Sequence, residues 1–289
     1  MPKADKTPKT AKNATSKPIK PAKTSESTEI SKNVIEVRHL TKTYKNPKTK
    51  SPLKAVDDLS FDVKEGEILG LLGPNGSGKS TTINCLLSLL KFDKGTIKIF
   101  GETMSPSAYD LKRQIGVVFQ EVAVFEELKV QDNIDFFCGL YIKDKTERKK
   151  CVDDAIKLVG LEDFRKFYPK QLSGGLLRRL NIACGIAHRP KLIFLDEPTV
   201  AVDPQSRQRI LDNIETLRRK GATVVYTTHY MEEVEQLCDR IIILDKGKII
   251  ASGTNEELKK LVKNKPVKQV AGPTLNDVFL ELTGKELRD

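Results

Sequence analysis

Short apolar runs alternate with polar turns along most of this chain, and their spacing predicts an α/β fold. Runs with the length and composition of buried or half-buried strands occupy residues 34–40, 59–63, 68–72, 96–100, 115–119, 192–195 and 224–228. Helical periodicity marks residues 81–90, 130–141, 147–159, 176–188 and 275–282. Near the C-terminus we expect a hairpin over residues 241–251, and a capping box of Thr254 with Glu257 that begins a helix over residues 258–262.

The order of these elements indicates how the chain is divided. It predicts a mostly parallel sheet, an antiparallel β unit on its N-terminal side, and an α-helical insertion over about residues 122–188. We expect residues 34–253 to form the main domain and residues 254–289 to form a helical segment at its end. At 289 residues, with 38% hydrophobic and 31% charged residues, the chain can bury one large core or two modest ones.

Residues 1–33 differ from the rest in composition. They are rich in Lys, Pro, Thr, Ser and Ala, and they carry eight Lys against three acidic residues, which is +5 of the chain's net charge of +11. The stretch has too few apolar side chains to repay the entropy of folding, and we therefore expect it to be disordered. It fits a solvated tail, a segment attracted to anionic lipid or RNA, or a link to a neighbouring subunit.

Apolar runs and cysteines limit the class of protein further. No run approaches the roughly 18 apolar residues that span a bilayer, and no apolar stretch follows the N-terminal lysines as it would in a signal peptide. The cysteines stand alone, without C-x-x-C pairs or nearby histidines: Cys85, Cys138, Cys151, Cys184 and Cys238. We therefore expect reduced thiols, neither disulfides nor metal ligands.

A glycine-rich loop with the spacing G-x-x-x-x-G-K-S follows residues 68–72 directly and precedes a predicted helix. It reads Gly73-Pro74-Asn75-Gly76-Ser77-Gly78-Lys79-Ser80-Thr81. Glycines let backbone N–H groups converge on an anion at a helix N-terminus, Lys79 can reach the outer phosphates of a nucleotide, and the Ser80 hydroxyl can ligate Mg²⁺. The strand before the loop and the helix after it are the context that this chemistry requires, so the stretch predicts a nucleotide-binding site.

Two adjacent carboxylates, Asp196 and Glu197, follow the apolar strand over residues 192–195. Carboxylates at the end of a buried strand need a partner, which can be Mg²⁺ or a structural ion pair. Because successive side chains of a strand point to opposite faces, the two should do different work. Asp196 can hold the metal directly or through water, and Glu197 can activate the water that attacks the γ-phosphate.

Three other residues each fit two interpretations. Gln120 ends its strand, where it either caps the strand or points at a metal or water beside the nucleotide. His229 also ends a strand, and is either a satisfied core group or a hydrogen-bond partner of the γ-phosphate or attacking water. Tyr44, between the first two strands, either packs in the sheet or offers a platform for a purine.

The segment Ser173-Gly174-Gly175 precedes the helix predicted over residues 176–188. Ser173 is expected to be its N-cap, and the glycines leave bare backbone N–H groups at the helix start. The plain interpretation is an ordinary helix start. The functional one is a second anion site, which could meet the same phosphates only if another subunit brought it there.

Taken in order, the glycine-rich loop, Gln120, Leu-Ser-Gly-Gly, Asp196-Glu197 and His229 resemble the ATP-binding cassette (ABC) family over roughly residues 34–251. Five motifs in one order make the resemblance specific. It implies a P-loop NTPase core, ATP and Mg²⁺ as nucleotide and metal, and a head-to-tail dimer of two ATPase subunits closing over two ATP molecules.

The resemblance also implies roles for individual residues. The loop of residues 73–81 corresponds to the phosphate cradle and Tyr44 to the aromatic that stacks on adenine. The signature that binds the partner's γ-phosphate corresponds to Ser173, Gly174 and Gly175, and Asp203 matches a dimer contact. Catalytic roles fall on Glu197 as base, His229 as switch histidine and Gln120. Metal contacts fall on Ser80, Gln120 and Asp196.

Two departures from the family pattern affect these expectations. Leu176 stands where the signature commonly has Gln, and Ala201-Val202 stands where Gly-Leu or Ala-Leu is more usual. We expect the contacts of Ser173 and Gly175 to survive, because they depend on a hydroxyl and on backbone. We expect Ala201-Val202 to change the packing between the two ATPase subunits.

A narrower resemblance, to the ATPase subunits of ABC-2-type exporters of drugs, antibiotics, lipids or polysaccharides, lies in residues 125–130 and 273–284. It implies an ATP hydrolase that drives export through a separate membrane permease and is held peripherally at the cytoplasmic face of the cell membrane. We expect residues 122–141 to dock on that permease, because the helical insertion offers apolar groups beyond those that the α/β core needs.

Two other classes compete with this prediction. ABC ATPases that act on ribosomes or DNA usually carry two cassettes or long coiled coils, whereas this chain has one cassette and no heptad run. Only the basic N-terminal stretch favours that class, so no specific nucleic acid partner is expected. A small-molecule kinase would need an acceptor pocket and no signature, which argues against it.

Overall fold

The computed structural model of the protein describes residues 32–45, 51–261 and 275–283. The tail predicted over residues 1–33 lies outside them except for Lys32 and Asn33, and Asn33 is already the first residue of a strand. Of the predicted C-terminal segment, residues 262–274 and 284–289 lie outside them as well. No helix in the described ranges is long and apolar enough to cross a membrane.

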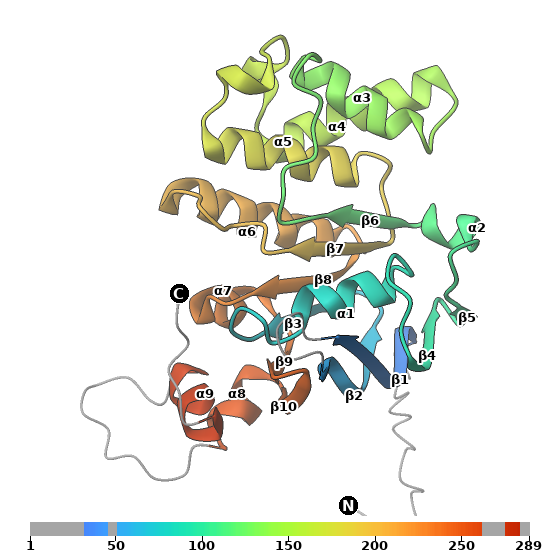
Figure 1. Ribbon diagram of the computed structural model, residues 1–289. Helices are drawn as coiled ribbons and strands as arrows, with labels where there is room; N and C mark the ends of the chain where they lie inside the picture. The colour runs from blue at the N-terminus through green and yellow to red at the C-terminus, as the bar shows by residue number, and fades with distance from the viewer. Residues whose placement is uncertain (1–31, 46–50, 262–274, 284–289) are drawn as a thin grey trace, which may run out of the picture. The chain divides into compact units, whose positions relative to one another are not determined.

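An antiparallel sheet with the strand order β2-β1-β4-β5 forms on the N-terminal side (Figure 1). Its strands are β1 (Asn33–Lys45), β2 (Pro52–Lys64), β4 (Lys94–Ile99) and β5 (Glu102–Thr103). Ile35 and Val37 on β1 are fully buried while Arg38 is exposed, the alternation of a sheet with one face in the core. The predicted antiparallel β unit is confirmed.

A second sheet of six strands carries the order β10-β9-β3-β8-β7-β6. Its strands are β3 (Ile68–Leu72), β6 (Ile115–Val118), β7 (Leu192–Asp196), β8 (Thr223–Thr228), β9 (Arg240–Asp245) and β10 (Lys248–Gly253). Every neighbouring pair is parallel except β9 with β10, which form the predicted hairpin. The carboxyl ends of the parallel strands therefore share one edge of the sheet.

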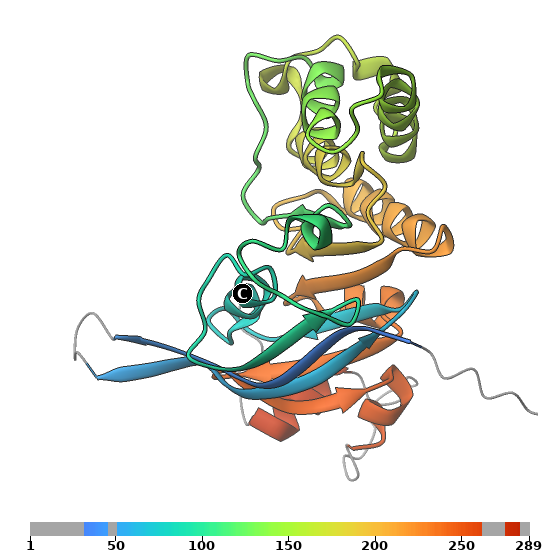
Figure 2. The same cartoon turned by 90° about the vertical axis from the view of Figure 1, so that its right-hand side faces the viewer.

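Alternate residues of the six-stranded sheet belong to two different hydrophobic cores. Leu192 and Phe194 pack with the antiparallel sheet and with α1 (Lys79–Leu86). Ile193 and Leu195 pack on the other face with the helices of the insertion and with α6 (Pro204–Arg219). Because both faces are covered, the strands are apolar throughout, as expected for a parallel sheet. Figure 2 shows the long blue strands of the antiparallel sheet running below the yellow strand β7 of the six-stranded sheet.

The insertion consists of three helices and two short 3₁₀ turns. The helices are α3 (Val130–Gly139), α4 (Lys145–Val159) and α5 (Gly174–Ile186), and the turns are Glu162–Phe164 and Pro169–Gln171. Asp144 caps α4 by accepting the N–H of Glu147 at 2.7 Å, and Gly160 ends it in the left-handed region at φ 65°. The predicted insertion is confirmed, and Figure 1 shows its helices grouped at one end, beyond β6.

The remaining helices cover the core. They are α2 (Tyr109–Lys112), α7 (Met231–Leu237), α8 (Asn255–Lys259) and α9 (Leu275–Thr283). The capping box of Thr254 and Glu257 is confirmed by both of its hydrogen bonds, at 2.8 and 3.3 Å, although α8 begins earlier than predicted. The thiols are all free, as predicted.

Some boundaries differ from the prediction, and α6 was not predicted. The helix expected over residues 81–90 ends at Leu86, because Ser88 takes a left-handed conformation at φ 54°. Only Ile210, Leu211 and Ile214 of α6 are buried. Together with Leu217 they have the spacing of an amphipathic helix, so the pattern contained the signal although α6 was not predicted.

Candidate functional site

The glycine-rich loop has the features of an anion site. Gly76 and Gly78 take positive φ values of 80° and 108°, which expose backbone N–H groups at the start of α1. No side chain of the described residues caps that helix end, and no acidic residue lies in its first turn. The Ser77 hydroxyl is buried and has no hydrogen-bond partner among the described residues. Orphaned donors at a helix N-terminus fit the phosphates of a nucleotide.

Lys79 is folded back onto its own loop. Its ammonium donates to the carbonyl oxygens of Gly73 at 2.8 Å and Pro74 at 3.3 Å, and only 5% of its side chain is exposed. The same nitrogen lies 3.1 Å from Oε1 of Glu197. A buried ammonium therefore has a buried carboxylate as its counter-ion, and a phosphate would have to compete with that carboxylate.

Glu197 stands between the lysine and the histidine that the sequence singled out. Its Oε2 lies 3.4 Å from Nδ1 of His229, and its side chain is 6% exposed. Glu197 adopts φ 47°, a left-handed conformation that is uncommon for a residue other than glycine. Such backbone outliers cluster at functional sites. The structure thus brings Lys79 at the start of α1 together with Glu197 and His229, which follow the ends of β7 and β8.

Thr227 holds the Asp196 carboxylate and the backbone of Glu197, and was not singled out from the sequence. Its Oγ1 donates to Oδ1 of Asp196 at 2.5 Å and accepts the backbone N–H of Glu197 at 3.0 Å. The register of β7 and β8 places Thr227 directly opposite Asp196. Hydroxyl side chains in a buried strand that leads directly to His229 are the signal that could have found it.

Asp196 fits a cation site. It is buried, with 5% exposed, and no positively charged side chain in the described ranges forms an ion pair with it. A buried carboxylate without a counter-ion is costly, and Mg²⁺ prefers oxygen ligands. Within the described residues no group of three or more His, Cys, Asp or Glu could hold a metal. Mg²⁺ would therefore need water, hydroxyl or phosphate oxygens besides Asp196.

The segment after β6, which contains Gln120, is fastened to α5. Arg178 donates from Nη1 to the carbonyl oxygens of Phe119 at 3.3 Å and Gln120 at 2.7 Å. Further along, Asn181 accepts the N–H of Ala123 at 3.1 Å. The Gln120 side chain is exposed at the sheet edge that also carries Asp196. Because α5 begins at the Ser-Gly-Gly segment, that segment and the Gln120 segment are joined by one helix.

Ser173, Gly175 and Asp203 lie together but apart from the glycine-rich loop. Ser173 is the N-cap of α5 and accepts the N–H of Leu176 at 3.4 Å. A Cβ on Gly175 would overlap the Ser206 side chain and lie 3.1 Å from Oδ2 of Asp203. Neither a hydrogen bond nor an ion pair between described residues joins this cluster to residues 73–81. Within one chain the two anion sites are separate.

Asp203 begins α6 as its N-cap, accepting the N–H of Ser206 at 2.9 Å. That hydrogen bond holds the pKa of the Asp203 carboxyl below its usual range. Just before it, Ala201 takes φ 58°, which explains why glycine suits this position, and Val202 is buried in the core. The contact between Ser173 and Leu176 uses backbone, so the Leu176 side chain leaves it intact.

Tyr44 lies on the antiparallel sheet near the loop. It is 40% exposed, pairs with Leu53 of β2, and has the Lys42 ammonium 5.4 Å from its ring centroid. The carbonyl of Ala55, two residues from Leu53, lies so close to Gly78 that a Cβ there would overlap it. An exposed ring on this side of the phosphate loop is available for stacking.

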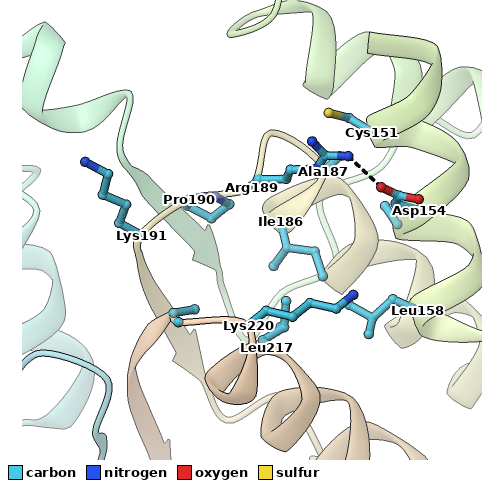
Figure 3. A pocket seen from close by; sticks show the side chains of 13 residues that line it. Cys151, Asp154, Leu158, Ile186, Ala187, Arg189, Pro190, Lys191, Leu217 and Lys220 are labelled. Atoms are coloured by element: carbon cyan, nitrogen blue, oxygen red, sulfur yellow. Dashed lines mark hydrogen bonds and ion pairs between the residues drawn. The ribbon is translucent and has the colours of Figure 1, made fainter. Parts of the chain in front are cut away.

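A cavity of about 240 Å³ lies elsewhere, between α4, α5 and α6. Figure 3 shows its apolar lining by Leu158, Ile186 and Leu217, with an Arg189–Asp154 ion pair at its rim. Lys191 and Ala222, which also line it, immediately precede β7 and β8. It is therefore at the amino ends of the strands, opposite the edge that carries Asp196 and His229, and does not belong to the candidate site.

Comparison with known proteins identifies relatives of the whole arrangement. The ABC transporter family matches residues 56–200. The linearmycin resistance ATP-binding protein LnrL of Bacillus subtilis is 42% identical over 225 residues, covering 78% of this chain and 72% of the relative. The doxorubicin resistance ATP-binding protein DrrA of Mycobacterium tuberculosis is 36% identical over 255 residues, covering 88% and 72%.

Solved structures agree in fold. An ATP-binding subunit of an ABC transporter superposes with a TM-score of 0.74 at 26% identity, covering 86% of this chain and 99% of that one. A dimeric ATP-binding cassette in a post-hydrolysis state, bound to ADP and phosphate, gives a TM-score of 0.69 at 30% identity and covers 76% and 98%.

Proposed function

The chain belongs to the ABC transporter family as an ATP-binding subunit with ATP hydrolase activity, and we propose that it drives export through a separate membrane permease. For the ATP hydrolysis that would power export, the observation that carries the proposal is the position of the Glu197 carboxylate, 3.1 Å from the Lys79 ammonium and 3.4 Å from the His229 imidazole. The names of the relatives, which confer resistance to linearmycin and doxorubicin, support export over action on ribosomes or DNA.

In the proposed reaction, residues of this chain bind the phosphates of ATP, orient the reacting groups and accept a proton from water. Lys79 leaves Glu197 for the outer phosphates of ATP, which frees Oε1 of Glu197 to accept a proton from the attacking water. His229 orients Glu197 and the γ-phosphate through its ring nitrogens. The Thr227 hydroxyl keeps the Asp196 carboxylate and the Glu197 backbone in place.

Mg²⁺ and the aromatic contact complete the proposed site. We assign the metal to Ser80 and Asp196, with Gln120 at the same sheet edge, and the adenine to Tyr44. When bound, Mg²⁺ would neutralise charge on the transferring phosphates. Residues 73–81 supply the backbone N–H groups for the phosphates.

Dimerisation is part of the proposal because one chain holds two separate halves of a site. Ser173, Gly174 and Gly175 would serve the phosphates bound on a second ATPase subunit, with Asp203 at the contact between them. The dimeric cassette bound to ADP and phosphate supports this arrangement. The partner can be a second copy of this chain or a related one.

We propose that the permease docks on an aromatic patch within residues 122–141, which would hold the protein peripherally at the cytoplasmic face of the membrane. Phe125, Phe136 and Leu140 are 41%, 45% and 54% exposed, and Phe125 lies 4.8 Å from Phe136 between ring centroids. Asn133, fully buried, fastens the loop beneath them with four hydrogen bonds to backbone. An exposed apolar patch on a rigid support is typical of an interaction surface.

Glu197→Gln tests the catalytic assignment. ATP binding should persist, hydrolysis should fall at least about a hundredfold, and an ATP-dependent dimer should accumulate in size-exclusion chromatography. Lys79→Ala should instead lose ATP binding itself. Near-normal turnover in Glu197→Gln would remove Glu197 as the base.

Phe125→Asp with Leu128→Asp tests the docking surface. The double variant should leave the membrane fraction and no longer co-purify with a permease. Phe167→Asp is the matched control, since Phe167 is 39% exposed on the insertion but outside residues 122–141. Unchanged co-purification of the double variant would contradict the docking assignment.

A further inference from the structure

A group of buried and half-buried polar side chains from β8, α6 and α7 lies next to His229, and the proposed reaction does not use it. Glu233 is 2% exposed, and its Oε2 accepts hydrogen bonds from the Tyr226 hydroxyl at 2.7 Å and the Thr228 hydroxyl at 2.8 Å. Burial, with the carboxylate beside it, raises the pKa of Tyr226 above its usual range, so the hydroxyl stays a donor. Glu233 is thus anchored to the strand that ends in His229.

Arg207 of α6 joins this carboxylate to an aromatic ring beside the histidine. Its Nε lies 3.5 Å from Oε1 of Glu233, and its guanidinium carbon lies 4.7 Å from the ring centroid of Tyr230. The Tyr230 and His229 rings are 4.2 Å apart between centroids. A guanidinium over an aromatic face is attracted to it and can hold the ring in one orientation.

Two contacts in this group are not hydrogen bonds in the structure: Arg207 with Glu233, and His229 with Glu197. Nε of Arg207, Oε1 of Glu233 and Nδ1 of His229 are buried atoms without a hydrogen-bond partner among the described residues. The atoms they face lie at 3.5 Å and, for His229 with Glu197, at 3.4 Å. Unsatisfied buried polar atoms are rare, and catalytic hydrogen bonds often tighten only in the reacting complex. A small shift of α6 toward α7 would close the first pair.

The helix that carries Arg207 begins at the dimer-contact residue. Asp203 is its N-cap, and the Asp203 carboxylate lies against Gly175 of the signature. One turn of helix therefore separates the contact with Gly175 from the side chain that holds Tyr230. Any displacement of the signature end of α5 reaches Arg207 through rigid helix.

We propose that Arg207 is a positioning residue for His229: it holds the Tyr230 ring, Glu233 holds its guanidinium, and α6 sets the imidazole according to the state of the signature. The effect on turnover rests on the proposed role of His229 in hydrolysis, whereas the effect on the imidazole does not. Engagement of the signature by the nucleotide of a second subunit would thereby orient His229 in this subunit.

NMR of the imidazole tests the positioning directly, without catalysis. The chain has three histidines, so the His229 ring protons can be assigned with His229→Gln. Arg207→Leu should move these signals, because the Tyr230 ring would no longer be held beside them. Arg209→Leu, on the exposed side of the same helix, is the matched control and should leave them in place. If the folded Arg207→Leu protein shows unmoved His229 signals, the proposal is overturned.

Steady-state kinetics of ATP hydrolysis provide a second test. If Arg207→Leu does not fold, Arg207→Lys replaces it, because lysine keeps the positive charge but cannot stack a planar guanidinium on Tyr230. We expect kcat to fall about tenfold with the KM for ATP unchanged, and expect no such fall in the His229→Gln background. An equal fall in that background would show that Arg207 acts elsewhere. If His229→Gln alone leaves turnover intact, the proposed role of His229 fails, while the NMR result still decides whether Arg207 positions it.

Discussion

Glu197→Gln should destabilise the nucleotide-free chain while strengthening its affinity for ATP. The substitution keeps the shape of the side chain and removes its charge. In the structure, that charge is the counter-ion of the Lys79 ammonium at 3.1 Å, in a place where the two side chains are 5% and 6% exposed. Among the described residues the other acceptors of Lys79 are the carbonyls of Gly73 and Pro74, so Gln leaves this buried cation with neutral partners there.

The size of the effect follows from burial and distance. At 3.1 Å and an effective dielectric constant of about 20, the attraction is about 5 kcal/mol. Removing one partner of a buried pair typically costs about 3–5 kcal/mol. The two carbonyls and the new amide oxygen still accept from Lys79, so we expect a loss of about 2 kcal/mol in the free energy of unfolding. Since ATP no longer competes with a carboxylate for Lys79, its affinity should rise about tenfold.

Two measurements without Mg²⁺ check this prediction: urea unfolding of the nucleotide-free protein, and calorimetric titration with ATP. Glu232→Gln makes the same charge change at an exposed position in the first turn of α7, and should alter neither quantity. An unfolding free energy and an ATP affinity that both match the wild type would show that Glu197 does not hold Lys79.

Three further substitutions test other parts of the structure. Gly175→Ala should lower ATPase activity about tenfold or more without changing ATP affinity, because its Cβ overlaps a side chain of the first turn of α6. Asn133→Ala should lower the free energy of unfolding in urea by about 3 kcal/mol, because it removes four hydrogen bonds between a fully buried side chain and the backbone. His188 is held neutral by burial, which lowers its pKa from 6.5 to about 4. The free energy of unfolding of the wild type should therefore fall by about 2–3 kcal/mol as the pH falls from 6.5 to 4, because His188 must be protonated. In pH-dependent unfolding curves His188→Gln should remove this decrease, whereas His39→Gln, at an exposed position, should leave it unchanged.

The sequence predicted the groups whose chemistry is visible locally. The glycine-rich loop, the paired carboxylates and the strand-ending histidine each stand beside an apolar run, and a parallel sheet brings such strand ends to one edge. The pattern therefore predicted that Glu197, the loop and His229 would lie at the same edge of the sheet. It did not predict that Lys79 would form an ion pair with Glu197, since the pattern does not show which cation faces which acid.

Supporting residues could not be predicted because their partners are set by tertiary register. Thr227 meets Asp196 only because β7 and β8 pair in parallel with those two residues opposite each other. Arg178 looks like an ordinary charged helix residue, yet it is buried with its guanidinium on the carbonyl of Gln120. A polar residue in the sequence carries no sign of whether it faces water or a backbone group far along the chain.

The contacts of Lys79 tie the start of catalysis to nucleotide binding. In the structure, one oxygen of the Glu197 carboxylate faces the ammonium and the other faces the imidazole of His229. A carboxylate in this position is a poor base, because proton transfer to it would leave Lys79 buried without its counter-ion. Only a group with at least as much negative charge, such as a phosphate in the loop, can draw the lysine away. In the proposed mechanism Glu197 is therefore freed by the substrate that it acts on, and Arg207 then determines whether His229 is oriented to assist it.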